Sequence, residues 1–440
     1  LSSQGAGLMT RFIHQGVTKL LGFIIFTLTM KSSVKSVSTP SIKHITIICT
    51  NDTLGVFEPC GCGGQNAGGL IRRSTYIKEI LAENPSAIVV ESGNLTSPVS
   101  VPPPAGQIDT VAEIMKLMGY TAVGVGTIDT RLGEKYFEAL KKKGLLVIHS
   151  DLKKHEGAVP YIIKEVDGVK IGIISFGAVP SGEENNYALF KERYRAFIDA
   201  RQKSDILVLL DQGRVATADW LIKNTNRFGS PDIVLPGAER SDLPDPQQVG
   251  QTMILPTSTQ GRLVGRVDIE WDGNIQKITY SSTPISKDIA DDPETVKLVK
   301  EYIERARLAA SQSPVDSIRY YNYQSCSACH TKETEQWKGT RHANALNTLI
   351  TKGKVIPDCL PCHSEMNRRT GGITLGGDNI GGVECGSCHS DVLPHGMDYK
   401  KKGNMEIIKT KCQECHTKDK SPNFNLDVAF EIVKHTKSKP

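Results

Sequence analysis

The chain has 440 residues, a formal net charge of +5 and 39% hydrophobic residues. This length predicts two or three domains, and the hydrophobic content is ordinary for a globular protein. A net charge this small is no signature of nucleic-acid binding, so we expect no nucleic acid among the partners.

Residues 1–38 carry the features of an export signal. Arg11 and Lys19 precede an apolar run at residues 20–30, and a polar stretch follows through Pro40. This pattern is typical of a signal peptide and is short for a membrane span. Because no small-residue cleavage site follows, an uncleaved N-terminal membrane anchor is the alternative. We expect a periplasmic or extracytoplasmic protein.

Strand and helix patterns alternate over about residues 42–283. Apolar, β-rich runs lie at 44–49, 87–90, 121–125, 145–149, 205–210 and 231–235. Helical patterns lie near 69–83, 109–118, 134–143, 187–202 and 214–226. Hairpin turns are expected at Asp167-Gly168 and Asp272-Gly-Asn274, so the last third should be antiparallel. The alternation predicts an α/β domain with a substantial buried sheet.

Three segments of this front domain resemble a known family. Residues 46–55, 68–73 and 90–97 resemble the 5′-nucleotidase branch of the calcineurin-like metallophosphatases. The resemblance covers about 42–283 and implies a layered α/β fold. It also implies two divalent metals that activate water for attack on phosphate.

Most metal-ligand positions implied by that resemblance have changed. Asp52 is kept, but the His two residues later is Leu54 and the bridging Asp is Asn94. At the remaining positions the family's Asn and His residues are replaced by Thr127, Ile128, Asp211, Ala238 and Arg240. Asp52, Asn94 and Asp211 therefore mark a residual site, and we expect the domain to be catalytically degenerate, because isolated carboxylates do not hold a dimetal centre.

Three cysteines lie in the front domain. Cys60 and Cys62 stand in a glycine-rich loop after the first predicted strand, where ligands converge in α/β sheets, and Cys49 lies on that strand. One interpretation is a structural disulfide, for example Cys60 to Cys62 with Cys49 buried. The alternatives are a redox-active or ligand-binding thiol site and a metal or cluster site.

Residues 284–320 are expected to connect two domains. Asp291 and its neighbours form a helix start, and 294–311 is a charged amphipathic helix. Beyond residue 320, glycine, proline and polar residues dominate. We expect a mostly α-helical and irregular domain at 321–440, with short helices around 333–350 and 426–436.

Four copies of one pentapeptide, Cys-x-x-Cys-His, lie in this last region. The cysteine pairs are Cys326 and Cys329, Cys359 and Cys362, Cys385 and Cys388, and Cys412 and Cys415. Each pair is followed at once by a histidine: His330, His363, His389 and His416. This is the signal for covalent haem c: two thiols form thioethers to the haem vinyl groups, and the histidine supplies the proximal nitrogen. Zinc sites do not need that histidine, and a disulfide framework would be strained. Four haem c groups are predicted.

The remaining histidines limit how these haems are ligated. Only His342, His395 and His435 are left in the region, so one of four irons lacks an obvious sixth ligand. That iron takes a methionine (Met366, Met397 or Met405), takes a histidine of the front domain, or stays five-coordinate and open to a small molecule.

This region resembles the cytochrome c554 family over about residues 321–436. The resemblance is carried by 324–330 with 337–345, by 383–389 with His395, and by 412–416 with Phe424 and His435. It implies tetrahaem electron transfer, with His342, His395 and His435 as distal ligands and one haem without a distal side chain. No histidine closely follows His363, so we expect the open haem there.

The sequence thus predicts an exported tetrahaem cytochrome that transfers electrons. The degenerate front domain is expected to act as a binding, docking or thiol-redox module. The expected partners are redox proteins or quinol-linked donors, with a small-molecule ligand as a further candidate. An alternative is an oxidoreductase that acts on a small nitrogen or sulfur compound at an open haem. A working 5′-nucleotidase is the least favoured hypothesis.

Overall fold

The structure is a computed structural model. It describes residues 41–59, 67–96, 103–104, 106–150, 157–177, 187–212, 229–237, 245–312, 320–374, 382–393, 403–418 and 420–435. The predicted signal or anchor, the predicted helix at 214–226, and Cys60, Cys62 and His395 lie outside these residues. Within them, no helix is long and apolar enough to cross a membrane.

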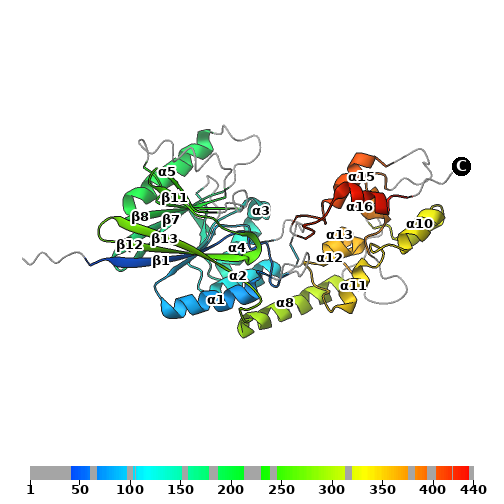
Figure 1. The fold of residues 1–440 in the computed structure, drawn as a ribbon, viewed down its shortest axis with the longest axis horizontal. Coiled ribbons are helices and arrows are strands. Elements are labelled where there is room, and N and C mark those ends of the chain that lie inside the picture. Colours follow the sequence, from blue (N-terminus) through cyan, green and yellow to red (C-terminus); the bar gives the residue numbers. More distant parts are fainter. Residues whose placement is uncertain are drawn as a thin grey trace, which may run out of the picture. The chain divides into compact units, whose positions relative to one another are not determined.

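Two β-sheets form the centre of the front domain (Figure 1). The seven-stranded sheet has the order β13-β12-β1-β2-β3-β4-β5, and the six-stranded sheet has the order β10-β11-β9-β8-β7-β6. The first comprises β1 (Lys43–Thr50), β2 (Ile88–Glu91), β3 (Ala122–Val123), β4 (Val147–Ile148), β5 (Ala158–Val159), β12 (Leu263–Trp271) and β13 (Ile275–Pro284). The second comprises β6 (Tyr161–Val166), β7 (Val169–Phe176), β8 (Ile206–Asp211), β9 (Ile233–Pro236), β10 (Gln247–Val249) and β11 (Thr252–Ile254).

Strand β1 shows how the sequence builds these layers. Ile45, Ile47 and Cys49 are buried between the two sheets, whereas Ile48 faces the helices on the outer side. Successive side chains on a strand point to opposite faces, and an apolar residue on both faces is typical of a strand covered on both sides. The sheet-to-sheet core and the two helical layers therefore follow from nearly continuous apolar strands.

Helices cover the outer faces of both sheets (Figure 1). The seven-stranded sheet is covered by α1 (Leu70–Glu83), α2 (Gln107–Leu117), α4 (Glu134–Lys142) and α8 (Pro293–Gln312). The short helix α3 (Thr127–Thr130) follows β3, and a 3₁₀ turn at Thr259–Gly261 precedes β12. Helix α5 (Tyr187–Lys203) packs on the six-stranded sheet through Phe197. The α/β class expected from the sequence is confirmed.

The predicted hairpins are present, and the predicted antiparallel last third is only partly right. β6 and β7 pair antiparallel across Val166 and Val169, and β12 pairs antiparallel with both β13 and β1. In contrast, β8 is parallel to β7 and β9, and β9 is parallel to β11. Parallel pairing needs crossovers between distant strands, which a local hairpin signal does not report.

Helix α8 does more than connect two domains. It lies in the stretch expected as a linker, but Val299, Tyr302 and Ala306 are buried in the same core as α1 and α2. Tyr302 packs against Phe57 with ring centres 4.9 Å apart. The amphipathic face of α8 is therefore part of the front domain's helical layer.

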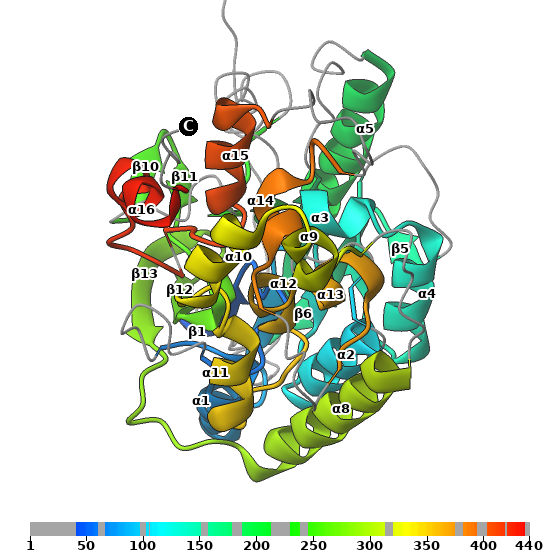
Figure 2. The same cartoon turned by 90° about the vertical axis from the view of Figure 1, so that its right-hand side faces the viewer.

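The region after residue 320 consists of short helices (Figure 2). They are α9 (Tyr323–Ser327), α10 (Thr331–Lys338), α11 (Ala345–Thr351), α12 (Leu360–His363), α13 (Glu365–Thr370), α14 (Cys385–His389), α15 (Met405–Cys412) and α16 (Leu426–Val433). A small cluster of buried apolar residues joins α11, α12 and the segment after α13: Leu346, Leu349, Leu360 and Ile373. A core of this size contrasts with the front domain and leaves the interior to be filled by something other than side chains.

Candidate functional site

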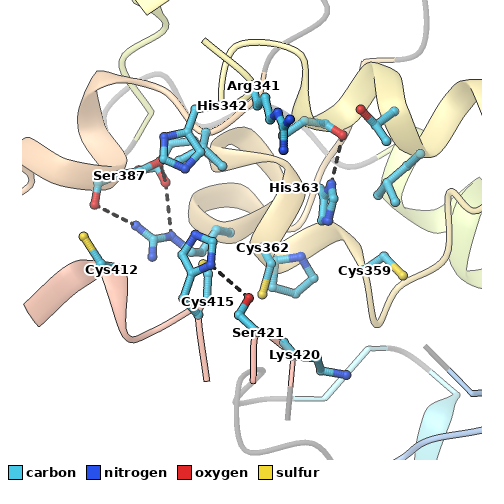
Figure 3. A pocket seen from close by; sticks show the side chains of 18 of the residues that line it. Arg341, His342, Cys359, Cys362, His363, Ser387, Cys412, Cys415, Lys420 and Ser421 are labelled. Atoms are coloured by element: carbon cyan, nitrogen blue, oxygen red, sulfur yellow. Dashed lines mark hydrogen bonds and ion pairs between the residues drawn. The ribbon is translucent and has the colours of Figure 1, made fainter. Parts of the chain in front are cut away.

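A large cavity lies among the helices of the C-terminal region (Figure 3). Its volume of about 1160 Å³ exceeds the roughly 300–1,000 Å³ of typical single-ligand pockets. Three of the four Cys-x-x-Cys-His motifs line it, through Cys359, Cys362, His363, Cys388, Cys412, Cys415 and His416. The cavity therefore gathers cysteines and histidines that are far apart in the sequence.

Each motif folds as one helical turn. The histidine N–H bonds to the carbonyl of the first cysteine in three motifs: His330 to Cys326 (2.9 Å), His363 to Cys359 (3.2 Å) and His416 to Cys412 (2.9 Å). The third motif is helix α14 itself. Residues four apart share one face of a helix, so the histidine and the first cysteine point to the same side. This is the arrangement that one cofactor bound to both residues requires.

The motifs are paired in space, the first with the third and the second with the fourth. The thiol of Cys385 is hydrogen-bonded to Cys326, which raises the Cys385 pKa. A hydrogen bond with Cys415 lowers the pKa of Cys362 to about 7. None of the eight motif cysteines, all of which are described, forms a disulfide. The sequence-predicted attachment residues are thus brought together in two groups, which a one-dimensional spacing pattern does not reveal.

Two of the predicted distal histidines face motif histidines. The ring centres of His342 and His416 are 6.3 Å apart, and those of His389 and His435 are 6.2 Å apart. A metal–imidazole bond is about 2 Å long and the nitrogen lies about 1 Å from its ring centre, so two rings that share one ion have centres about 6 Å apart. Both pairs therefore have the separation at which a single iron fits between them. His395 lies outside the described residues.

Hydrogen bonds hold several of these rings by Nδ1. His363 Nδ1 lies 2.9 Å from the Ala345 carbonyl, His416 Nδ1 lies 3.0 Å from Ser421 Oγ, and His435 Nδ1 lies 3.3 Å from Gln336 Oε1. A ring whose Nδ1 donates in this way offers Nε2 to a metal. Burial also lowers the pKa of His342, His389 and His416, which favours the neutral form that binds metals. The side chains fit haem c with histidine ligands.

Arg368 donates hydrogen bonds to residues in or next to three of the motifs. Its guanidinium donates to Glu365, the second residue after His363, at 3.1 Å and to Glu414, inside the fourth motif, at 2.7 Å. It also reaches the carbonyl of Ser387, inside the third motif, at 3.5 Å. Glu365 is nearly fully buried and accepts further bonds from Ser387 and Arg369. The sequence analysis missed this network, because only contact between distant segments makes it visible.

Basic side chains also line the cavity and suit the propionates expected of a haem. Arg341, Lys354, Lys411 and Lys420 are among the lining residues. Of these, Lys411 is paired with Glu414 and Lys354 with Glu58. Lys409, in the same helix as Lys411, is paired with Asp427. The residues that line the cavity are therefore the candidates for contact with propionates.

The residual metal-ligand positions of the front domain form a different kind of site. Asp52 and Asn94 meet at the ends of β1 and β2, and Asn94 Nδ2 donates to Asp52 Oδ1 at 2.7 Å. Asn51 Nδ2 donates to the other carboxylate oxygen at 2.7 Å, and Asn94 also donates to Gln212 at 3.1 Å. Burial raises the pKa of Asp52 to about 6 despite these bonds. Side-chain amides thus occupy both oxygens of the retained carboxylate.

Two further residues complete this network, and the sequence analysis missed both. Asp129 accepts backbone N–H bonds from Asn94 (2.6 Å), Leu95 (3.0 Å) and Gly126 (2.9 Å). Gln212 directly follows Asp211, and Asp211 is itself buried at the end of β8. Among the described residues, no group of three or more His, Cys, Asp or Glu side chains is arranged to hold a metal ion.

Cys49 does not have the surroundings of a reactive thiol. Its side chain is 1% exposed, lies between the two sheets, and is a free cysteine. Burial raises its pKa to about 12, so it stays protonated near neutral pH. A thiol site that includes Cys49 is therefore disfavoured. The proposal for Cys60 and Cys62 concerns residues outside the described part of the chain.

Comparisons with known proteins find a family match in the C-terminal region. Residues 325–390 match the family model of cytochrome c554 and c-prime. Over 114 residues the chain is 29% identical to cytochrome c-554 of Nitrosomonas europaea, a match that covers 22% of this chain and 48% of that protein. The chain thus spans about half the length of this curated relative. Three of the four motifs fall within the residues that match the family model.

The solved structures that are similar to the chain include three hydrolases. A sulfate thiohydrolase of Thermus thermophilus has a TM-score of 0.49 at 16% identity, covering 62% of each chain. A 5′-nucleotidase precursor of the same organism gives 0.49 at 16%, covering 62% of this chain and 61% of that one. A calcineurin-like phosphoesterase of Bacillus subtilis gives 0.48 at 17%, covering 60% and 98%. What this front domain does must be argued from its own residues.

Proposed function

We propose that this chain is an exported tetrahaem c-type cytochrome that relays electrons, with a front domain that has lost phosphoesterase chemistry. The observation that carries this proposal is the pair of histidine–histidine separations, 6.2 and 6.3 Å, each beside a Cys-x-x-Cys-His turn. Bound haem would supply one-electron redox chemistry. Redox proteins or quinol-linked donors are the proposed partners, and the periplasm is the proposed compartment.

The two histidine pairs assign a proposed role to four histidines. His416 is the proximal and His342 the distal ligand of the fourth haem, and His389 and His435 are the corresponding pair of the third. His395 remains for the first or the second haem. With three spare histidines for four irons, one haem lacks a distal histidine from this region, and the haem at His363 is proposed to be that one.

Haem content and spin state test this proposal. Mass spectrometry of the exported protein should find four covalent haems, and EPR should show three low-spin centres and one high-spin centre. Replacement of His342 by Ala should convert one further haem to high spin, whereas His44→Ala, in the front domain, should convert none. Four low-spin haems in the native protein would contradict the open site at His363.

A small-molecule oxidoreductase is the second candidate, and it depends on that open haem. Its test is turnover of a small nitrogen or sulfur compound by the reduced or oxidised holoprotein. Phosphoester hydrolysis is disfavoured, because the two oxygens of Asp52 are already bonded to Asn94 and Asn51. Stoichiometric divalent metal together with phosphatase turnover would reverse this view. Titration of Cys60 and Cys62 at defined potentials tests the thiol-redox role.

A further inference from the structure

The front domain contributes to the wall of the haem-region cavity. Val56, Glu58 and Pro59, from the segment that follows β1, line it together with residues of the second motif. This segment, Leu54–Pro59, is called the wall segment below. From the sequence, the front domain was considered only as a source of one histidine ligand, so this shared wall is a feature that the structure supplies.

Two polar contacts join the front domain to the second motif. Gln107 Nε2, at the start of α2, donates to Asp358 at 2.9 Å, and Lys354 Nζ lies 2.9 Å from Glu58. Asp358 directly precedes Cys359 in the chain. Lys354 lies five residues before Cys359 and lines the same cavity. Both contacts therefore converge on the attachment point of one haem.

The two contacts differ in strength. Gln107 is completely buried, so water cannot readily replace its hydrogen bond to Asp358. The Lys354–Glu58 pair is partly exposed, and exposed ion pairs contribute little to stability. Gln107 is thus the main fixing point and Glu58 a weaker one.

The wall segment is held firmly from the other side by the residual phosphoesterase site. Leu54 N–H bonds to the Asn94 carbonyl at 2.9 Å, and Gly55 N–H bonds to the Leu95 carbonyl at 2.7 Å. Gly55 has a φ of +69°, and a Cβ there would lie 2.6 Å from the Gln107 amide nitrogen. The side chain of Phe57 packs on Tyr302. Asn94 and Gln107 therefore act on the same short segment from two sides.

We infer that the front domain completes the site of the haem attached at Cys359 and Cys362, with the wall segment controlling how a small neutral ligand reaches that haem. This inference rests on the proposed covalent haem at the second motif. It assigns the degenerate domain a structural task at the haem, in place of chemistry at Asp52.

Hydrogen–deuterium exchange tests whether the wall segment covers this haem. In the double variant Cys359→Ala/Cys362→Ala, the amides of residues 54–58 should exchange about tenfold faster than in the native holoprotein, because roughly 1.4 kcal/mol of protection is lost. The matched control, Cys326→Ala/Cys329→Ala, removes the first haem and should leave these amides unchanged. Equal exchange in the native protein and the first variant, or an equal increase in both variants, would overturn the inference.

Carbon monoxide binding to the ferrous holoprotein tests control of access. Gln107→Leu should raise the association rate by at least about tenfold. The single reversals Glu58→Lys and Lys354→Glu should raise it by up to about fivefold, and the double reversal should restore the native rate. Lys143→Glu, at an exposed front-domain pair away from the cavity, is the control. Carbon monoxide association rates that are unchanged in Gln107→Leu and in both single reversals would refute the access role.

The tests separate the two levels of the proposal. If the native protein binds no carbon monoxide, the open haem of the proposed function fails, and the exchange experiment still decides whether the wall segment covers the second haem. If carbon monoxide binds but no wall variant changes its rate, the proposed function stands and control of access by the front domain fails. Should Gln107→Leu not fold, the charge reversals carry the access test alone.

Discussion

The two parts of this chain reach stability in opposite ways. The front domain encloses a continuous core between and around its sheets, with residues such as Ile171, Val208 and Phe197 fully buried. The C-terminal region has a cluster of four buried apolar residues among its described helices, and beside it a cavity of about 1160 Å³. A core of side chains is sufficient for the first part, whereas in our proposal the second has bound haem as its interior. The contrast agrees with the buried apolar strands of the front domain and the short helices after residue 320.

Production of the chain without haem should have the largest effect and should separate the behaviour of the two parts. When the chain is produced without haem attachment, we expect the C-terminal region to lose its fold and the front domain to keep its own, because only the latter has a core of side chains. Limited proteolysis with mass spectrometry should show a protected fragment that begins near residue 42 and includes α8. Fragments that end before α8 would contradict its place in the front domain's core.

Truncation of a core side chain in the front domain should destabilise that domain and leave the haem region unchanged. Phe197→Ala removes a fully buried ring that packs 6.4 Å from the ring of Phe176, so it should lower the stability of the front domain by about 3–5 kcal/mol. Denaturant unfolding followed by circular dichroism measures this loss. The visible haem spectrum should not change. The exposed Val249→Ala is the control and should have little effect on either signal.

Loss of the Arg368 network should destabilise the haem region selectively. Arg368→Met leaves the buried Glu365 with fewer partners, and breaking a buried ion pair costs about 3 kcal/mol or somewhat more. The remaining bonds from Arg369 and Ser387 place the expected loss at the lower end. Haem stoichiometry and the thermal midpoint of the haem spectrum are the measurements. An unchanged midpoint would show that the haems themselves, and not Arg368, hold the motifs together.

The front domain should become less stable as the pH rises. Burial raises the pKa of Asp52 and Asp129 to about 6 and that of Glu91 to about 7. The folded state therefore binds more protons than the unfolded chain, and stability is lost as the pH rises from about 4 to 7. One pKa unit corresponds to about 1.4 kcal/mol for each group. Urea unfolding at pH 5 and pH 8 checks the sign, and Glu91→Gln should flatten the profile.

The smallest predicted effect concerns one haem potential. His435→Met should raise the potential of the haem at His389 while keeping it low spin, because methionine ligation favours the reduced iron. A redox titration followed optically should show one component moving and three unchanged. Ile432→Met, an exposed change on helix α16, is the control. Movement of a different component would mean that His435 serves another iron.

Local patterns in the sequence predicted most elements of the front domain. The expected helix 69–83 is α1 and the expected strand 44–49 is β1, because apolar spacing reports directly on burial. The order of the strands in the sheet could not be predicted, because β1 lies between β12 and β2 and the pairing of β1 with β12 joins segments far apart in the chain. The expected helix at 333–350 is divided into α10 and α11, with His342 in the turns between them.

In the candidate site, too, local features could be predicted from the sequence and long-range contacts could not. The Cys-x-x-Cys-His turns were predictable, because one helical turn contains all their chemistry. The pairing of His342 with His416, the contact of Gln107 with Asp358, and the amides around Asp52 were not, since each depends on how distant segments meet. Even a complete list of motif residues therefore leaves the ligand pairs and the neighbours of each haem undetermined.

The histidine pairs have a consequence for how the C-terminal region matures. His342 precedes the second motif and His416 belongs to the fourth, so an iron held by both closes a long loop of chain. In the proposed ligation, His389 and His435 close a second loop that overlaps the first. Each iron then limits the conformations of the chain between its two histidines. We expect the region to reach its final fold only after the fourth motif, which supplies His416, has received its haem.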